Sequence, residues 1–63
     1  MTAYKVTFRW YDTDTYCTNL VYSKDYDKVA REYNKYEIIS ITEADESFVR
    51  TAKLKGMPIK TIF

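Results

Sequence analysis

Apolar and polar residues alternate at the start of the chain. The even positions carry rings or a branched aliphatic side chain and the odd positions are polar: Tyr4, Val6, Phe8 and Trp10 against Lys5, Thr7 and Arg9. A period of two that is rich in aromatic and β-branched residues is typical of a half-buried β-strand. The pattern therefore predicts a strand over residues 3–11.

A second β-prone stretch, Thr15–Tyr22, follows the polar residues Asp12-Thr13-Asp14, which favour a turn. Two strands joined by about three turn residues predict a β-hairpin. Alternation gives the second strand two faces, with Tyr16, Leu20 and Tyr22 on one and Cys17 and Val21 on the other.

Residues 24–34 follow a helical period instead. The apolar positions spaced i, i+3, i+4 and i+7 are Tyr26, Val29, Ala30 and Tyr33. Ser23 is of a type that caps helix N-termini, and Asn34 can adopt the left-handed conformation that closes a helix. We therefore expect a helix over residues 24–34, capped at Ser23.

A short β-branched run, Tyr36–Thr42, contains Ile38, Ile39 and Ile41. Because this run is apolar on both sides near its centre, it predicts a third strand in the interior of the sheet.

Residues 43–55 carry agreeing signals for a second helix. Thr42 followed three residues later by Asp45 is close to a capping box, and Gly56 stands where a C-terminal cap belongs. The expected buried stripe is Ala44, Phe48, Val49 and Ala52. The alternative is a strand over 47–54, where apolar and polar residues also partly alternate; the helix is favoured because the terminal signals agree.

The last seven residues, 57–63, form a short edge strand or a tail, because Pro58 excludes a central strand. Together the elements predict one α+β domain over residues 1–63. Its order is strand, strand, helix, strand, helix, with the short C-terminal strand as an addition. We expect a small antiparallel sheet of three to four strands with one or two helices packed on one face.

The composition removes most enzyme classes. The 63 residues include no histidine, one cysteine and one glycine. Catalytic triads and the usual zinc sites need histidine or several cysteines, and phosphate-binding loops need several glycines. The sequence therefore predicts a non-enzymatic protein without a metal or a cofactor.

The ring-rich stretch has two interpretations. Tyr4, Phe8 and Trp10, with Tyr16 and Tyr22, form either the core beneath the helices or an exposed face that stacks nucleic-acid bases. A chain of 63 residues needs its aromatic residues inside, so the core is favoured.

Basic residues near the C-terminus are the second candidate for nucleic acid, because each cation that contacts a phosphate adds affinity. They are Arg50, Lys53, Lys55 and Lys60. A solvated helix end accounts for the first three equally well. The net charge of +1 lacks the strongly basic character of a free-standing nucleic-acid binder.

Tyrosine is in surplus, since seven are more than so small a core encloses. We expect one or more of four to reach the surface, where tyrosine is a favoured contact residue: Tyr11, Tyr22, Tyr33 or Tyr36. The candidate contact residues for a protein or nucleic-acid partner are Trp10, Tyr11, Tyr22, Arg50, Lys53, Lys55 and Lys60.

Three stretches, Tyr4-x-Val6-x-Phe8, Asp25–Ala30 and Ile38-Ile39-x-Ile41, resemble short open reading frames on conjugative elements and phages of Gram-positive bacteria. The resemblance covers about 40 residues. Those proteins are mostly without an assigned function, so the resemblance implies a host setting and transfers no activity and no functional residue.

The expected function is therefore a small protein–protein interaction module that binds a partner protein or a second copy of itself. The alternative is a nucleic-acid-binding accessory protein. The N-terminal residues lack a basic leader followed by an apolar stretch, and no apolar run approaches the ~20 residues of a membrane span. We expect a cytoplasmic protein without a membrane partner.

Overall fold

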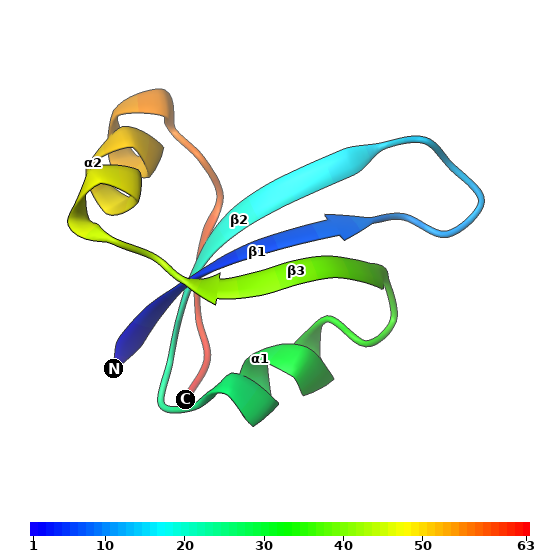
Figure 1. Ribbon diagram of the computed structural model, residues 1–63, viewed down its shortest axis with the longest axis horizontal. Helices are drawn as coiled ribbons and strands as arrows, with labels where there is room; N and C mark the ends of the chain where they lie inside the picture. Colours follow the sequence, from blue (N-terminus) through cyan, green and yellow to red (C-terminus); the bar gives the residue numbers. More distant parts are fainter.

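The computed structural model describes residues 1–63 and contains a sheet with two helices (Figure 1). The elements are β1 (Thr2–Arg9), β2 (Tyr16–Ser23), α1 (Tyr26–Glu32), β3 (Glu37–Glu43), α2 (Glu46–Lys55) and β4 (Ile59–Thr61). This order confirms the α+β class, the hairpin and the short last strand. It also confirms the helix, rather than the alternative strand, over the segment that contains α2.

The four strands form one sheet in the order β3-β1-β2-β4. β1 pairs antiparallel with both β2 and β3, as expected. β4 pairs parallel with β2, so the sheet is mixed and not purely antiparallel. The reason is the helical connection: α2 carries the chain back across the sheet, so β4 runs in the same direction as β3, which is also the direction of β2.

The prediction of an interior position for β3 is wrong, because β3 lies at an edge of the sheet. The pairing with β1 shifts between Thr7, which faces Ser40, and Phe8, which faces Ile38. Ile39 is therefore an extra residue, a β-bulge, and is half exposed. The bulge brings Ile38 and Ile41 to the same side of the sheet. The isoleucines of β3 therefore contribute to one buried face and not to two.

The main core lies between α1 and the face of β1 that carries the even-numbered residues. It is a cluster of buried side chains: Tyr4, Val6, Phe8, Val21, Val29 and Tyr33. Tyr4 and Phe8 are thus core residues, as the favoured interpretation predicted. Tyr16 and Tyr22 are not, because the register pairs them with Arg9 and Ala3 on the other face.

That other face has a smaller buried centre of its own. Leu20 and Ala52 are completely buried, although neither belongs to the cluster beneath α1. The Lys5 ammonium lies 5.2 Å from the centre of the Phe48 ring, which shows that α2 packs on the odd-numbered side of β1. The two helices therefore cover opposite faces instead of sharing one. The physical reason is Leu20, an apolar side chain that needs cover on the second face.

The ends of the helices differ in part from the predicted caps. Asp25, not Ser23, caps α1, and its carboxylate accepts a hydrogen bond from Lys28 N at 2.8 Å. Ser23 is instead the buried last residue of β2. Asn34 does not close α1 in the left-handed conformation, because the C-cap is Tyr33 with φ −102°.

The second helix ends as predicted, but the prediction of its start is wrong. Thr42 and Glu43 are the last residues of β3, so the N-cap is Asp45 and not Thr42, and Ala44 lies before the helix rather than in its buried stripe. The Asp45 carboxylate accepts a hydrogen bond from Phe48 N at 2.8 Å. Gly56 closes α2 with φ 70°, a left-handed conformation that glycine adopts without a Cβ penalty.

We expect Asp25→Ala and Asp45→Ala each to lower the free energy of unfolding by about 1 kcal/mol, since each leaves a helical N–H without its acceptor. Urea unfolding followed by circular dichroism measures the loss. Asp27→Ala, in the first turn of α1 but not at its cap, is the matched control and costs less. Equal losses at all three positions would contradict the capping role.

Candidate interaction surface

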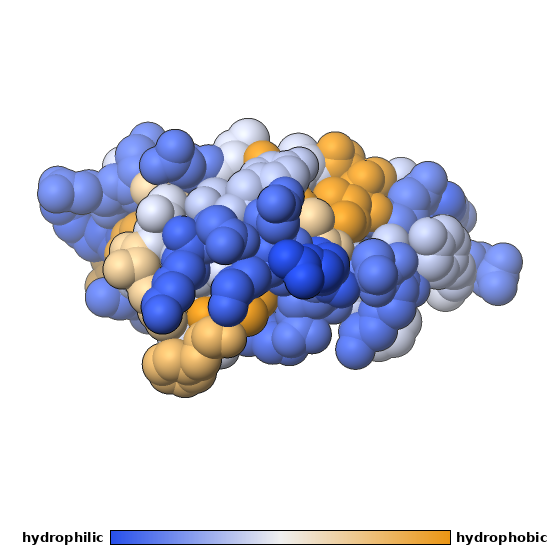
Figure 2. Space-filling model, turned by 90° about the horizontal axis from the view of Figure 1, so that it is seen from below, coloured by the Kyte–Doolittle hydropathy of each residue, from blue (hydrophilic) through white to orange (hydrophobic).

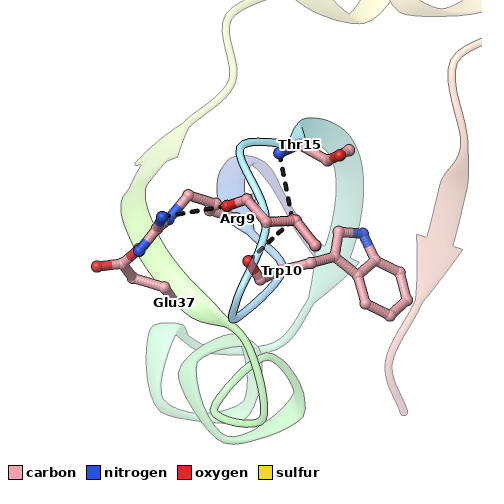
Figure 3. A network of polar contacts seen from close by, with 5 residues as sticks. Arg9, Trp10, Thr15 and Glu37 are labelled. Carbon is pink, nitrogen blue, oxygen red and sulfur yellow. Dashed lines mark hydrogen bonds and ion pairs between the residues drawn. The ribbon is translucent and has the colours of Figure 1, made fainter.

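A compact network of hydrogen bonds holds the loop between β1 and β2 (Figure 3). Trp10 O accepts hydrogen bonds from Thr13 N at 3.3 Å and from Thr13 Oγ1 at 3.1 Å. Thr15 N donates to Thr13 Oγ1 at 3.2 Å, and Trp10 N donates to Thr15 O at 3.4 Å. Asp12 completes the turn with φ 66°. The loop is therefore ordered by its own polar groups.

Arg9 ties this loop to the neighbouring strand β3. Its Nε donates to the Glu37 carboxylate, and its Nη1 donates to Thr13 O at 3.1 Å. The hydrogen bond to Glu37 is the largest cause that raises the pKa of Arg9 above its ordinary value. Because residues 9 and 37 lie far apart in the chain, no local pattern in the sequence points to this pair.

A chain of four aromatic rings runs from the core to this loop. The ring centres of Phe8 and Tyr33 lie 5.0 Å apart, and those of Phe8 and Tyr36 lie 4.7 Å apart. Trp10 packs edge-on against Tyr36 with the ring centres 4.9 Å apart. Phe8 and Tyr33 are buried, Tyr36 is half-buried, and Trp10 is 47 % exposed.

The exposure of Trp10 corrects the expectation that it belongs to the core. Trp10 is the first residue after the end of β1. Its ring packs against Tyr36 and does not reach the buried cluster. Tyr11, the next residue, is also exposed. We call Trp10, Tyr11 and Tyr36 the hairpin-end surface.

The remaining candidate rings do not extend this surface into a stacking platform. Tyr16 is exposed and Tyr22 is half-buried, but both lie on the opposite face of the sheet from Phe8. Tyr33, one of four tyrosines considered for the surface, is buried. The sheet therefore presents no single face of stacked, exposed aromatic residues.

The charges around the hairpin-end surface do not favour phosphate. Asp12 and Asp14 lie in the loop itself. The guanidinium of Arg9 already forms an ion pair with Glu37. The only other cation that the structure places beside these rings is Lys35, whose ammonium lies 5.5 Å from the centre of the Tyr36 ring.

The predicted basic set is divided and lies elsewhere. Arg50, Lys53 and Lys55 are exposed on α2, which lies at the opposite end of the long axis from the loop (Figure 1). Arg50 and Lys53 line an open groove that also contains two carboxylates, Asp45 and Glu46.

Lys60 does not join that set. Its register partner is Val21, on the α1 side of the sheet, and its ammonium pairs with Glu32 of α1 at 3.3 Å. The structure thus keeps Arg50, Lys53 and Lys55 on one helix, separates Lys60 from them, and places none of the four beside Trp10.

Outside the hairpin-end surface, exposed apolar residues are scattered. Those with large side chains are Met1, Tyr16, Tyr26, Ile39, Leu54, Ile59 and Phe63. The face of the molecule drawn in Figure 2 is mostly hydrophilic, with orange areas of limited size. Isolated apolar residues of this kind are normal on a protein surface.

Two further observations concern metal ions and membranes. No group of three or more histidine, cysteine, aspartate or glutamate residues is placed to hold a metal ion. Neither helix has the length and apolar character needed to cross a membrane.

Comparisons of the chain with protein-family models, with curated proteins and with solved structures found no match.

Proposed function

We propose that this protein is a small, non-enzymatic protein-interaction module whose central contact residue is Trp10. The observation that carries the proposal is that Trp10 is exposed and yet fixed in place. Its ring packs on Tyr36, and its backbone makes hydrogen bonds with Thr13 and Thr15. A ring that is already ordered loses little conformational entropy when a partner covers it.

Residue type supports the same function. Tryptophan and tyrosine are enriched among the residues that dominate binding energy at protein interfaces. Trp10 and Tyr11 are consecutive residues at the start of the loop and both are exposed, and the half-buried Tyr36 packs against the indole. The proposed surface is small, so it fits a short segment or a small domain of the partner.

A protein partner is favoured over a nucleic acid by the position of the charges. Binding to phosphates depends on cations that lie beside the contact surface. Here the exposed rings lie beside Asp12 and Asp14, whereas Arg50 and Lys53 lie at the far end of the molecule. The proposed setting is the cytoplasm of a Gram-positive host that carries a mobile element, as the sequence resemblance implies.

The proposal predicts that Trp10→Ala abolishes partner binding. The full-length protein is immobilised and used to capture a partner from a Gram-positive lysate, and the affinity for the captured protein is then measured. Loss of a central contact costs at least ~2 kcal/mol, which corresponds to a fall in affinity of about 30-fold. The variant should remain folded, because the loss of one aromatic pair costs only ~0.5–1.5 kcal/mol. Circular dichroism checks this.

Leu54→Ala is the matched control, because Leu54 is 82 % exposed on α2 and far from the loop. It should bind like the unmodified protein. Light scattering tests self-association in the same samples. A strict monomer that captures no protein would count against the proposal. Oligonucleotide binding at ~50 mM salt that survives Trp10→Ala would favour the nucleic-acid alternative.

A further inference from the structure

The outer edge of β3 is an unpaired strand edge. β3 is the terminal strand of the sheet, and Ser40, Thr42 and Glu43 are exposed along it. α1 contacts both β2 and β3, the strands on either side of β1. The helix therefore lies across the face of the sheet and does not cover the β3 edge.

The backbone groups that face outward on β3 can be identified from the ladder. Ala44 N donates to Ala3 O at 2.8 Å, so Ala44 and Ala3 are a hydrogen-bonded pair. In an antiparallel ladder such pairs alternate along the strand with pairs that exchange no hydrogen bonds. By that alternation Thr42 points its N–H and C=O toward β1. The N–H and C=O groups of Ile41 and Glu43 point away from the sheet and are free to pair with another strand.

The opposite edge of the sheet is much less suited to pairing. β4 has only three residues, Ile59–Thr61, and follows Pro58 directly. Short edge strands and a neighbouring proline are common means of preventing strand addition. β3 has seven residues and no proline. Its bulge at Ile39 interrupts one end of the edge, which leaves Ser40–Glu43 as the regular part.

The charges of β3 distinguish between possible occupants. β3 begins with Glu37, ends with Glu43 and contains no cation. If two copies paired antiparallel over the full length of β3, Glu37 of each copy would lie opposite Glu43 of the other. Like charges that face each other across two strands are destabilising, whereas opposite charges are favourable.

Glu43 is also chemically available. The ion pairs of the structure are Arg9–Glu37 and Lys60–Glu32, so Glu43 has no cationic partner. The same edge leads directly to the hairpin-end surface, because β3 starts one residue after Tyr36. A seven-residue strand spans about 24 Å, so one extended segment can reach from Glu43 to the rings.

We propose that the outer edge of β3 binds an extended, basic segment of a partner protein as an additional antiparallel strand, with a lysine or arginine opposite Glu43. This inference rests on the proposed function and names the chemistry of the partner. The segment makes main-chain hydrogen bonds with Ile41 and Glu43, and its far end contacts the hairpin-end surface.

The test uses the full-length protein and a synthetic seven-residue peptide with lysine at both ends and alternating threonine and valine between them. Hydrogen exchange measured by NMR is the readout, because it reports individual amides. The Ile41 and Glu43 amides should exchange at least tenfold more slowly with saturating peptide. The Thr42 amide, which already faces β1, should change little. Unchanged exchange at Ile41 and Glu43 would overturn the inference.

Charge reversal tests the partner chemistry. Glu43→Lys should weaken binding of the lysine peptide about three- to tenfold and strengthen binding of the same peptide with glutamate at both ends. Glu46→Lys is the matched control, because Glu46 is exposed nearby at the start of α2, and it should leave both affinities unchanged. Equal binding of the two peptides to the unmodified protein would refute the inference that the bound segment is basic.

Two outcomes separate this inference from the proposed function. If a captured partner depends on Trp10 but binds Glu43→Lys normally and leaves the Ile41 amide unprotected, the interaction module stands and strand addition is wrong. If Ile41 and Glu43 become protected as the protein concentration rises without any peptide, the occupant is a second copy of the chain and the basic segment is wrong.

Discussion

Phe8→Ala is expected to unfold most of the protein at 25 °C. Phe8 is 5 % exposed. Its ring packs against Tyr33 of the core and against Tyr36, which in turn contacts Trp10. Truncation of a buried phenylalanine costs about 3–5 kcal/mol. Because a domain of this size has only about 3–5 kcal/mol of stability in total, this single change removes nearly all of it.

Urea unfolding monitored by far-UV circular dichroism and by Trp10 fluorescence measures the effect. Phe63→Ala is the matched control, since Phe63 is 87 % exposed, and it should change the free energy of unfolding by less than about 0.5 kcal/mol. A cooperative transition in Phe8→Ala with a loss below about 1 kcal/mol would show that the ring chain does not link the core to the loop.

Leu20→Ala is expected to lower the free energy of unfolding by about 2–5 kcal/mol. Leu20 is completely buried, but it lies on the face opposite the main core. Its loss removes the largest completely buried side chain, which lies on the face of the sheet on which α2 packs. The effect therefore measures whether the second face carries a substantial part of the stability.

Hydrogen exchange distinguishes the two faces in this variant. Amides of α2 should exchange faster than those of α1, which packs on the other side of the sheet. Leu54→Ala controls for the loss of a leucine on the same helix, because that side chain is almost fully exposed. Similar losses for Leu20→Ala and Leu54→Ala would contradict a second buried centre.

These stability changes bear on the proposed binding surface. The indole of Trp10 is positioned by Tyr36, which packs on Phe8 of the core. A partner that recognises an ordered ring therefore depends on an intact core, and variants at Phe8 report on folding and not on contact. Trp10 itself is the position at which binding and stability can be separated.

Much of the local structure could be predicted because its causes are local. Alternation in the first strand determines which side chains share a face, and Tyr4, Val6 and Phe8 are indeed buried together. Gly56 marks the end of α2 because capping depends on hydrogen bonds within a few residues, whereas the expected cap at Thr42 belongs to β3 and the helix starts later, after Asp45. The N-cap of α1 differs from the expected Ser23, because β2 extends through Ser23 and the helix starts only after Asp25.

The position of each strand in the sheet was decided by the tertiary structure. The run Ile38–Ile41 is compatible with two buried faces, but the register with β1 creates a bulge and leaves β3 at an edge. The assignment of α2 to the second face likewise follows from Leu20, which needs cover there. Pairing between segments distant in sequence depends on contacts that no local pattern encodes.

The candidate site shows the same division. The sequence alone marks Trp10 and Tyr11 as candidate contact residues, excludes the common catalytic inventories and identifies the C-terminal cations. Only the fold puts Arg9 against Glu37, leaves Trp10 beyond the last rung of β1 and separates the rings from Arg50 and Lys53. Periodicity determines which face a side chain occupies, whereas its exposure depends on what the rest of the chain places over it.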